Sequence, residues 1–184
     1  MGDHFSKLTL LQKKQKNLAS CLISNSKTVI LGIGSNLGDR KNNIKKAIDL
    51  IPLEQKIAGN IIKTKALLPK DAPKSWDIEY LNTVVVGRPI FDVQQTFCKI
   101  KSIEAKMRRK KSKKWAPRIV DIDILFWESN LIALPYLNVP HFGATKRQFV
   151  LKPIADLLPF FVHPVSGVFA RQMLFNLLKL AKRS

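Results

Sequence analysis

Two aspartates stand two residues apart in an otherwise apolar segment, residues 119–124, which reads Ile-Val-Asp-Ile-Asp-Ile. Residues two apart on a β-strand share a face, so the carboxylates of Asp121 and Asp123 would lie side by side with aliphatic residues behind them. Such a pair repels itself and is costly to desolvate unless cations relieve it. Carboxylates at this spacing suit Mg²⁺, which proteins hold through one or two carboxylates together with substrate phosphates. The alternative is a half-exposed strand whose aspartates face water, which ordinary strand alternation also produces.

A dense run of lysine and arginine precedes the aspartates, between Lys101 and Arg118. Cations here would face the same phosphates as a metal held by the aspartates, which favours a phosphate–metal site. Like charges this dense repel one another, so we expect residues 106–115 to be mobile without ligand and protected once an anionic ligand binds. A solvated helix end or an RNA-binding patch is the alternative, although Trp115 is the only aromatic residue in the run.

Two further groups of side chains are candidates for ligand binding. His141, Arg147 and Phe149 are close in sequence, and an imidazole, a guanidinium and an aromatic ring could converge on one molecule. Tyr80 and Asn82 share a face of an expected strand, where a ring can stack on a flat heterocycle and an amide can read its edge. Each has an ordinary alternative: a structural histidine, and two polar strand positions turned towards water.

A glycine-containing turn at residues 32–36 needs comparison with phosphate-binding loops. It lacks the third glycine of a dinucleotide fingerprint and the Gly-Lys-Ser/Thr of a P-loop. A tight strand-to-helix turn explains its small residues, and either Asn36 or Asp39 could cap the helix that follows.

The chain has 184 residues, 46% of them hydrophobic, which predicts one domain with a sizeable core. The formal net charge of +19 indicates an anionic partner: a nucleic acid, a membrane surface or a phosphorylated small molecule. We expect residues 1–27 to be a flexible N-terminal extension, although its leucines and lysines would also allow a basic amphipathic helix at a membrane surface. The two cysteines have no disulfide or metal spacing, which predicts a cytoplasmic protein, and Cys98 is expected to be buried in a helix. No stretch has the length and apolarity of a membrane span.

The periodicity of apolar residues predicts the elements that must position these groups. Their order, β-α-β-β-α-β, indicates an α+β sandwich with helices on one face of an antiparallel sheet, in the ferredoxin-like arrangement, with additions at the C-terminus. The long loop at residues 67–78, rich in proline and lysine, is expected to be functional. The expected strands are residues 28–33, 57–66, 80–87 and 119–124, and the expected helices are residues 40–51, 91–107 and 168–181.

Together these segments resemble the 6-hydroxymethyl-7,8-dihydropterin pyrophosphokinase family of folate biosynthesis. The most specific part is the pattern Trp-x-Pro-Arg-x-x-Asp-x-Asp-Ile, at residues 115–124. The resemblance covers residue 28 to the C-terminus, and it also rests on Leu-Gly-Ile-Gly-Ser-Asn-Leu-Gly-Asp (31–39), Tyr-Leu-Asn (80–82), Val-Pro-His-Phe (139–142) and Arg-x-Phe (147–149).

The resemblance implies transfer of pyrophosphate from ATP to the hydroxymethyl group of the reduced pterin, with release of AMP. It implies two Mg²⁺ ions bridged by Asp121 and Asp123. It implies catalytic roles for Arg108, Lys110, Arg118, Asp121 and Asp123. It implies nucleotide contacts from Glu104, Trp115, Arg118, Ile124, His141, Phe142 and Arg147. It implies pterin contacts from Tyr80, Asn82, Trp115, Asp121 and Phe149.

The chain departs from the family pattern at several positions. Lys110 and Lys114 stand where the family often has arginine, and lysine offers a point charge in place of a bidentate fork. Phe142 stands where a tyrosine is frequent, and the loop before Tyr80 is longer than usual.

The expected partners are therefore ATP and the reduced pterin, with no nucleic acid, no membrane and a monomeric protein. A basic RNA-binding α+β module without catalysis is the rival interpretation. The usual RNA-recognition signature is missing from the sequence, and the two aspartates would repel RNA. A third interpretation, a family member that has lost activity, is disfavoured because all matched acidic positions and most matched basic ones are present.

Overall fold

The structure is a computed structural model that describes residues 28–108, 113 and 115–182. The expected N-terminal extension, residues 1–27, lies outside the described residues. Lys110, Lys114 and other parts of the basic run expected to become protected on ligand binding also lie outside them.

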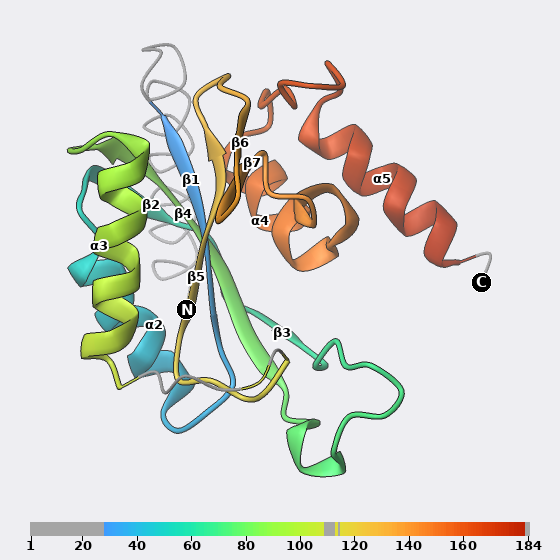
Figure 1. Ribbon diagram of the computed structural model, residues 1–184. Coiled ribbons are helices and arrows are strands. Elements are labelled where there is room, and N and C mark those ends of the chain that lie inside the picture. Colours follow the sequence, from blue (N-terminus) through green and yellow to red (C-terminus); the bar gives the residue numbers. More distant parts are fainter. Residues whose placement is uncertain (1–27, 109–112, 114, 183–184) are drawn as a thin grey trace, which may run out of the picture.

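An antiparallel five-stranded sheet forms the centre of the fold (Figure 1). Four strands follow the order β2-β4-β1-β5, and the short β3 pairs with β4. The two central strands, β1 and β4, are buried along most of their length, as their long apolar sequences require. The strands are β1 (Val29–Ser35), β2 (Leu53–Ala58), β3 (Ile62–Thr64), β4 (Tyr80–Pro89) and β5 (Asp121–Trp127).

Helices cover both faces of this sheet (Figure 1). On one face lie α2 (Arg40–Leu50) and α3 (Val93–Lys106), and on the other lies α4 (Gln148–Leu157). The C-terminal helix α5 (Ala170–Ala181) packs mainly against α4 and extends away from the sheet (Figure 1). Of the two proposed caps, Asp39 caps α2, because its carboxylate accepts a hydrogen bond from the Asn42 N–H at 3.1 Å. No helix within the described residues is both long and apolar enough to cross a lipid bilayer.

The predicted α+β fold and its β-α-β-β-α-β order are confirmed, and three details of the prediction were wrong. The strand expected at residues 57–66 is split into β2 and β3, because the four-residue step from Ala58 to Ile62 opposes only a three-residue step on β4, from Val85 to Asn82. Cys98 is exposed on α3 and is not part of the core. The prediction also missed α4, which contains Pro153, and a hairpin of β6 (Ile132–Leu134) and β7 (Leu137–Val139).

Alternating residues of β1, β4 and β5 divide between the two faces. The aliphatic face packs against α2 and α3 and includes Leu31, Ile33, Leu81 and Ile122. The opposite face packs against α4 and the first turn of α5 through residues such as Ile30, Val84, Val86 and Phe126. Towards one end of the strands this second face changes from aliphatic to small and polar residues, and the candidate site lies there.

Candidate active site

Asp121 and Asp123 lie on the face of β5 that is turned away from the aliphatic face, as the strand alternation predicts. Their neighbours on β1 are glycines, since Gly34 pairs with Asp121 and Gly32 pairs with Asp123. Because these glycines lack side chains, the side chains of Leu125 and Asn82 lie close over β1, 3.2 Å and 2.9 Å from where the Cβ atoms of Gly32 and Gly34 would stand. The two carboxylates line a hollow on the same face.

A cavity of about 210 Å³ occupies this hollow. It is bounded by the sheet, by β3 and the loop after it, by residues just before β5, and by the segment from β7 into α4. Ten of its lining residues were predicted from sequence as site residues: Tyr80, Asn82, Trp115, Arg118, Asp121, Asp123, His141, Phe142, Arg147 and Phe149.

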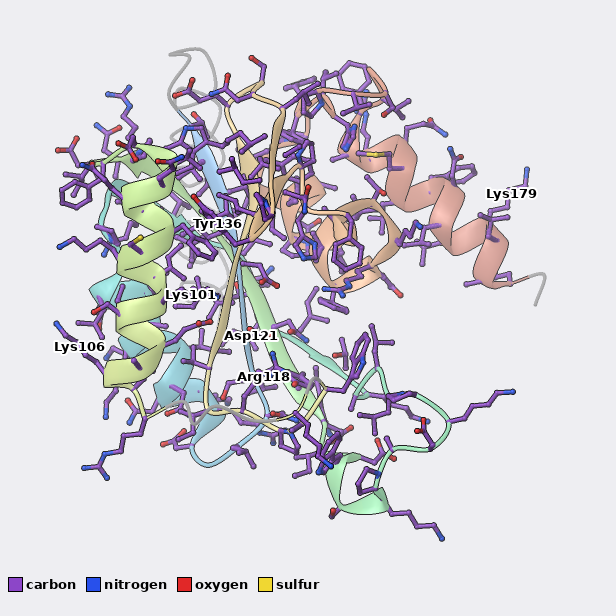
Figure 2. The ribbon with its side chains drawn as sticks, viewed as in Figure 1. Lys101, Lys106, Arg118, Asp121, Tyr136 and Lys179 are labelled. Atoms are coloured by element: carbon purple, nitrogen blue, oxygen red, sulfur yellow. The ribbon has the colours of Figure 1, made fainter. Side chains whose placement is uncertain are left out.

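The carboxylate of Asp123 is strongly perturbed. Burial raises its pKa to about 6, and repulsion from Asp121 adds to the rise, while the positive charges of Lys101 and Arg147 oppose it. Asp121 forms an ion pair with Arg118, whose Nη1 lies 3.0 Å from Oδ2 (Figure 2). A carboxylate whose charge is penalised in this way would gain from a divalent cation at the pair, so the donor set fits Mg²⁺ shared with phosphate oxygens.

Arg118 is held in place through its backbone by Asn36. The Arg118 N–H donates to Oδ1 of Asn36 at 2.7 Å, and the Asn36 N–H donates back to the Arg118 carbonyl at 3.2 Å. The Asn36 side-chain amide also donates to the carbonyl of Ile78, at 3.3 Å, in the loop before Tyr80. The buried Asn36 therefore joins the glycine turn to both of these segments.

One end of the cavity carries Tyr80 and Asn82 from the start of β4. The Nδ2 group of Asn82 donates to Oγ1 of Thr64 on β3 at 2.9 Å. The other side of this amide lies against β1, because a Cβ on Gly34 would stand only 2.9 Å from Asn82 Oδ1. A planar amide beside the Tyr80 ring suits a flat heterocycle with hydrogen-bonding edges.

His141 enters the site through the segment after β7. The Val139–Pro140 peptide bond is cis, and the His141 N–H donates to the Leu125 carbonyl at 2.9 Å. Burial lowers the pKa of His141, and the charge of Arg147 lowers it further. Its Nδ1 accepts a hydrogen bond from the Gly143 N–H at 3.1 Å. His141 is therefore neutral at pH 7 and carries its proton on Nε2, where it can donate to a ligand.

Arg147 stands at the start of α4 and lies flat against Gly143. A Cβ on Gly143 would be 2.9 Å from both Cζ and Nε of Arg147, so only glycine leaves the guanidinium this position. The guanidinium is also 5.8 Å from the centre of the Phe149 ring. Arg118, Arg147 and neutral His141 thus bring two positive charges and a hydrogen-bond donor to the side of the cavity near the aspartates.

Three of the predicted site residues that the structure describes do not line the cavity. Ile124 has its side chain in the aliphatic core, and Arg108 is exposed at the end of α3 with a φ of 62°. Glu104 is 4% exposed, and its carboxylate is bonded to a backbone N–H of β5. Lys110 lies outside the described residues.

Several lining residues were missed from sequence. Thr64, Lys65, Leu67 and Leu68 come from β3 and the following loop, and Gly143 supports Arg147. The length of the expected loop, residues 67–78, was the only available signal for Leu67 and Leu68, whereas Thr64 and Lys65 fall in the expected strand before it. The sequence gives no sign of the contact with Gly143, because it depends on the path of the chain after the cis peptide.

Comparison with known proteins identifies the family. Residues 30–159 match the family described as 7,8-dihydro-6-hydroxymethylpterin-pyrophosphokinase (HPPK). The "2-amino-4-hydroxy-6-hydroxymethyldihydropteridine pyrophosphokinase" of Aquifex aeolicus is 35% identical over 144 residues, which cover 75% of this chain and 84% of that protein. The "Folate synthesis bifunctional protein" of Chlamydia trachomatis is 36% identical over 137 residues, or 72% of this chain, but this chain spans only 30% of that protein's length.

Solved structures agree on the fold. Plasmodium falciparum HPPK-DHPS with pterin and p-hydrobenzoate superposes with a TM-score of 0.64 at 16% identity, over 86% of this chain and 45% of that chain. At this identity the likeness concerns the fold alone. The match over residues 30–159 includes Asp121, Asp123 and most of the cavity described above. The chain therefore belongs to the HPPK family.

Proposed function

We propose that this protein transfers pyrophosphate from ATP to the hydroxymethyl group of 6-hydroxymethyl-7,8-dihydropterin and releases AMP. The observation that carries the proposal is a single cavity with three kinds of groups: the Asp121–Asp123 pair, the cations Arg118 and Arg147, and a ring-and-amide end at Tyr80 and Asn82. A flat heterocycle and a polyphosphate could each find suitable partners there without leaving the same cavity.

The pterin end of the cavity would bind by stacking and by edge recognition. Tyr80, Phe149 and Trp115 supply aromatic surfaces, and the Asn82 amide offers both a donor and an acceptor to a pterin edge. Thr64 holds Nδ2 of this amide, which restrains its rotation before any ligand arrives. Restraint of this kind lowers the entropy lost on binding.

The phosphate end would bind by charge. Arg147 can present two parallel N–H groups to phosphate oxygens, and Arg118 can present the N–H groups that its bonds to Ala116 and Asp121 leave over. His141 adds a neutral N–H donor. Mg²⁺ at Asp121 and Asp123, for which we propose two ions, would neutralise phosphate oxygens and polarise the reacting groups when bound. Phosphoryl-type transfer asks the protein mainly for positioning and charge stabilisation, and these side chains provide both.

In the proposed reaction the hydroxymethyl oxygen of the pterin forms a bond to the β-phosphorus of ATP. The bond from that phosphorus to the oxygen shared with the α-phosphate breaks, and AMP leaves with this oxygen. The hydroxyl proton passes to water or to an aspartate, because Asp121 and Asp123 are the only acidic side chains among the described residues that line the cavity. No other general base is needed in this scheme.

The wider setting is also proposed. We take residues 28–184 as the catalytic domain and residues 1–27 as an extension, a division supported by a family match that begins at residue 30. We propose a monomer, because one chain supplies all the lining residues described. The free, exposed thiol of Cys98 suits the cytoplasm, which is reducing.

Incubation of the purified protein with ATP, Mg²⁺ and the reduced hydroxymethylpterin tests the proposal. We expect AMP and pyrophosphorylated pterin in equal amounts, little AMP when the pterin is left out, and none with excess EDTA. Equal AMP with and without pterin would indicate plain hydrolysis. No ATP consumption, together with salt-dependent binding to unrelated RNAs, would favour the RNA-binding interpretation, which neither the family match nor the two aspartates in the cavity support.

A further inference from the structure

The peptide unit between the two candidate metal ligands lies at the edge of the sheet. Within the part of the chain that the structure describes, β5 is the last strand on its side of the sheet, and β1 is its neighbour. The Ile122 N–H, which belongs to the peptide that follows Asp121, therefore meets no described strand on the outer side. An unpaired buried N–H would leave this part of the strand poorly fixed.

Glu104 of α3 supplies the acceptor that a neighbouring strand would otherwise provide. Its Oε1 accepts a hydrogen bond from the Ile122 N–H at 2.8 Å, and its Oε2 lies 3.0 Å from Nζ of Lys101. The Glu104 side chain is 5% exposed, whereas that of Lys101 is 43% exposed. Lys101 therefore stabilises the buried charge from the solvent side, and Figure 2 shows it on α3.

The location of Glu104 rules out a direct part in lining the cavity. Its neighbours on α3, Ile100 and Ile103, pack with Ile122 in the core of the aliphatic face. The cavity lies on the opposite face of the sheet, where Asp121 and Asp123 point. Glu104 thus contacts the backbone of the metal-binding strand from behind.

We propose that Glu104 is a positioning residue that fixes the Ile122 peptide and thereby the direction of the Asp121 and Asp123 carboxylates. This inference rests on the proposed function only in taking those carboxylates as metal ligands. The bond restrains the two backbone torsions on either side of the peptide, and rotation about them would swing the Asp121 carboxylate relative to that of Asp123. Groups that orient metal ligands in this way commonly matter for metal affinity almost as much as the ligands themselves.

Two conservative variants separate reach from charge. Glu104→Gln keeps an oxygen at the same distance but removes the charge, so it retains the bond to Ile122. Glu104→Asp keeps the charge but is one methylene shorter, so its oxygen falls short of the Ile122 N–H. If Glu104 acts by positioning, Glu104→Asp should lose more metal affinity than Glu104→Gln. If its role is purely electrostatic, Glu104→Gln should lose more.

The readout is Mn²⁺ binding, followed by the loss of the free-ion electron paramagnetic resonance signal. Mn²⁺ is titrated into the protein with an ATP analogue that carries a methylene group between the α- and β-phosphates. We expect Glu104→Asp to weaken Mn²⁺ binding by about tenfold or more, and Glu104→Gln to stay within about threefold of wild type. Ile103→Ala, which removes core packing from the same helix but keeps the hydrogen bond from the Ile122 N–H to Glu104, should leave the affinity unchanged.

Three results would overturn the inference. Glu104→Gln could bind Mn²⁺ as weakly as Glu104→Asp, Glu104→Asp could bind Mn²⁺ as tightly as wild type, or Ile103→Ala could bind Mn²⁺ as weakly as Glu104→Asp. Thermal unfolding identifies any variant that fails to fold. If Glu104→Asp fails to fold, the Mn²⁺ affinity of Glu104→Gln compared with that of wild type still tests the inference. Because the readout needs no turnover, a wild-type protein that binds Mn²⁺ but makes no AMP would refute the proposed reaction and leave this inference standing. A wild-type protein that binds no Mn²⁺ would refute both.

Discussion

The two faces of the central sheet are built from the same strands but do different work. On β1 the aliphatic face has Leu31 and Ile33, whereas the cavity side of the same strand has Gly32 and Gly34. The aliphatic face is filled by side chains from α2 and α3, whereas the other face leaves a hollow lined by polar, aromatic and aliphatic groups. One side of the sheet therefore supplies most of the stability at this end of the molecule, and the other side supplies the chemistry.

The largest effect should come from the cavity side of β5. Asp123→Asn should lower kcat by about a hundredfold to a thousandfold, since it removes a charged ligand of the proposed metal site. Steady-state assays at saturating Mg²⁺ measure this loss, and circular dichroism checks that the variant is folded. Activity near that of wild type would mean that Asp123 holds no catalytic metal.

Adjacent residues of β4 offer a direct comparison of the faces. Leu81→Ala should lower the free energy of unfolding by about 2–5 kcal/mol, because it leaves a cavity in the core, with kcat per folded molecule unchanged. Asn82→Ala should lower kcat/KM for the pterin by about 10- to 100-fold, through the loss of hydrogen bonds to the substrate. Its free energy of unfolding should fall by less than about 1.5 kcal/mol, since only the bond to Thr64 is lost.

Chemical denaturation and pterin kinetics of both variants test this division. If Leu81→Ala lost kcat as severely as Asn82→Ala lost kcat/KM, the two faces would not be separable. A substitution in the core would then disturb the cavity through the sheet, and alternate residues of one strand would not act independently.

The raised pKa of Asp123 predicts an unusual dependence of stability on pH. The folded protein binds a proton at Asp123 below about pH 6, whereas the unfolded chain does so only below its ordinary value of 3.8. Without metal, the ionised carboxylate therefore destabilises the fold above pH 6, and this penalty disappears as the pH falls towards 4. At pH 8 the free energy of unfolding of Asp123→Asn should be about 1–3 kcal/mol higher than that of wild type. Near pH 4 the two should differ little.

Denaturant titrations at pH 4, 6 and 8 in EDTA measure this difference. Addition of Mg²⁺ with a non-hydrolysable nucleotide should stabilise wild type more than the variant. A constant difference across the three pH values would show that burial of Asp123 does not penalise its charge.

The smallest effects should come from two glycines on opposite faces. Gly87→Ala on β4 would place a Cβ 2.8 Å from the backbone carbonyl of Glu54, which should lower the free energy of unfolding by about 1–3 kcal/mol. Gly143→Ala meets only the end of the Arg147 side chain, which can move aside. Its stability should stay near that of wild type, and KM for ATP should rise by about three- to tenfold as one charged hydrogen bond weakens.

Thermal unfolding and ATP kinetics of the two variants form the measurement. A stability loss in Gly143→Ala equal to that in Gly87→Ala would mean that Arg147 is rigidly fixed and not free to move aside.

The sequence predicted the parts of this molecule that depend on local patterns. Alternation placed Asp121 and Asp123 on one face, and the spacing of Tyr80 and Asn82 placed both in the cavity. What it missed depends on contacts between distant segments. The hydrogen bond from the Ile122 N–H to Glu104 joins a strand edge to a helix. Neither residue type nor spacing could reveal that the Glu104 carboxylate points to the backbone of β5 and not into the cavity.

The division of the second strand was missed for a related reason. Residues 57–66 do follow one edge of β4, but the extra residue between β2 and β3 shifts the register. This shift sends Thr64 to the side chain of Asn82. A pattern of alternating residues cannot reveal such an insertion until the partner strand is known.

The three hydrogen bonds that Asn36 makes to Arg118 and Ile78 have a mechanical consequence. A displacement of the segment that carries Arg118 would move Asn36, and Asn36 would in turn move the segment that leads into Tyr80. Binding at one half of the cavity would thus shift groups in the other half through a single residue, without any hinge between domains.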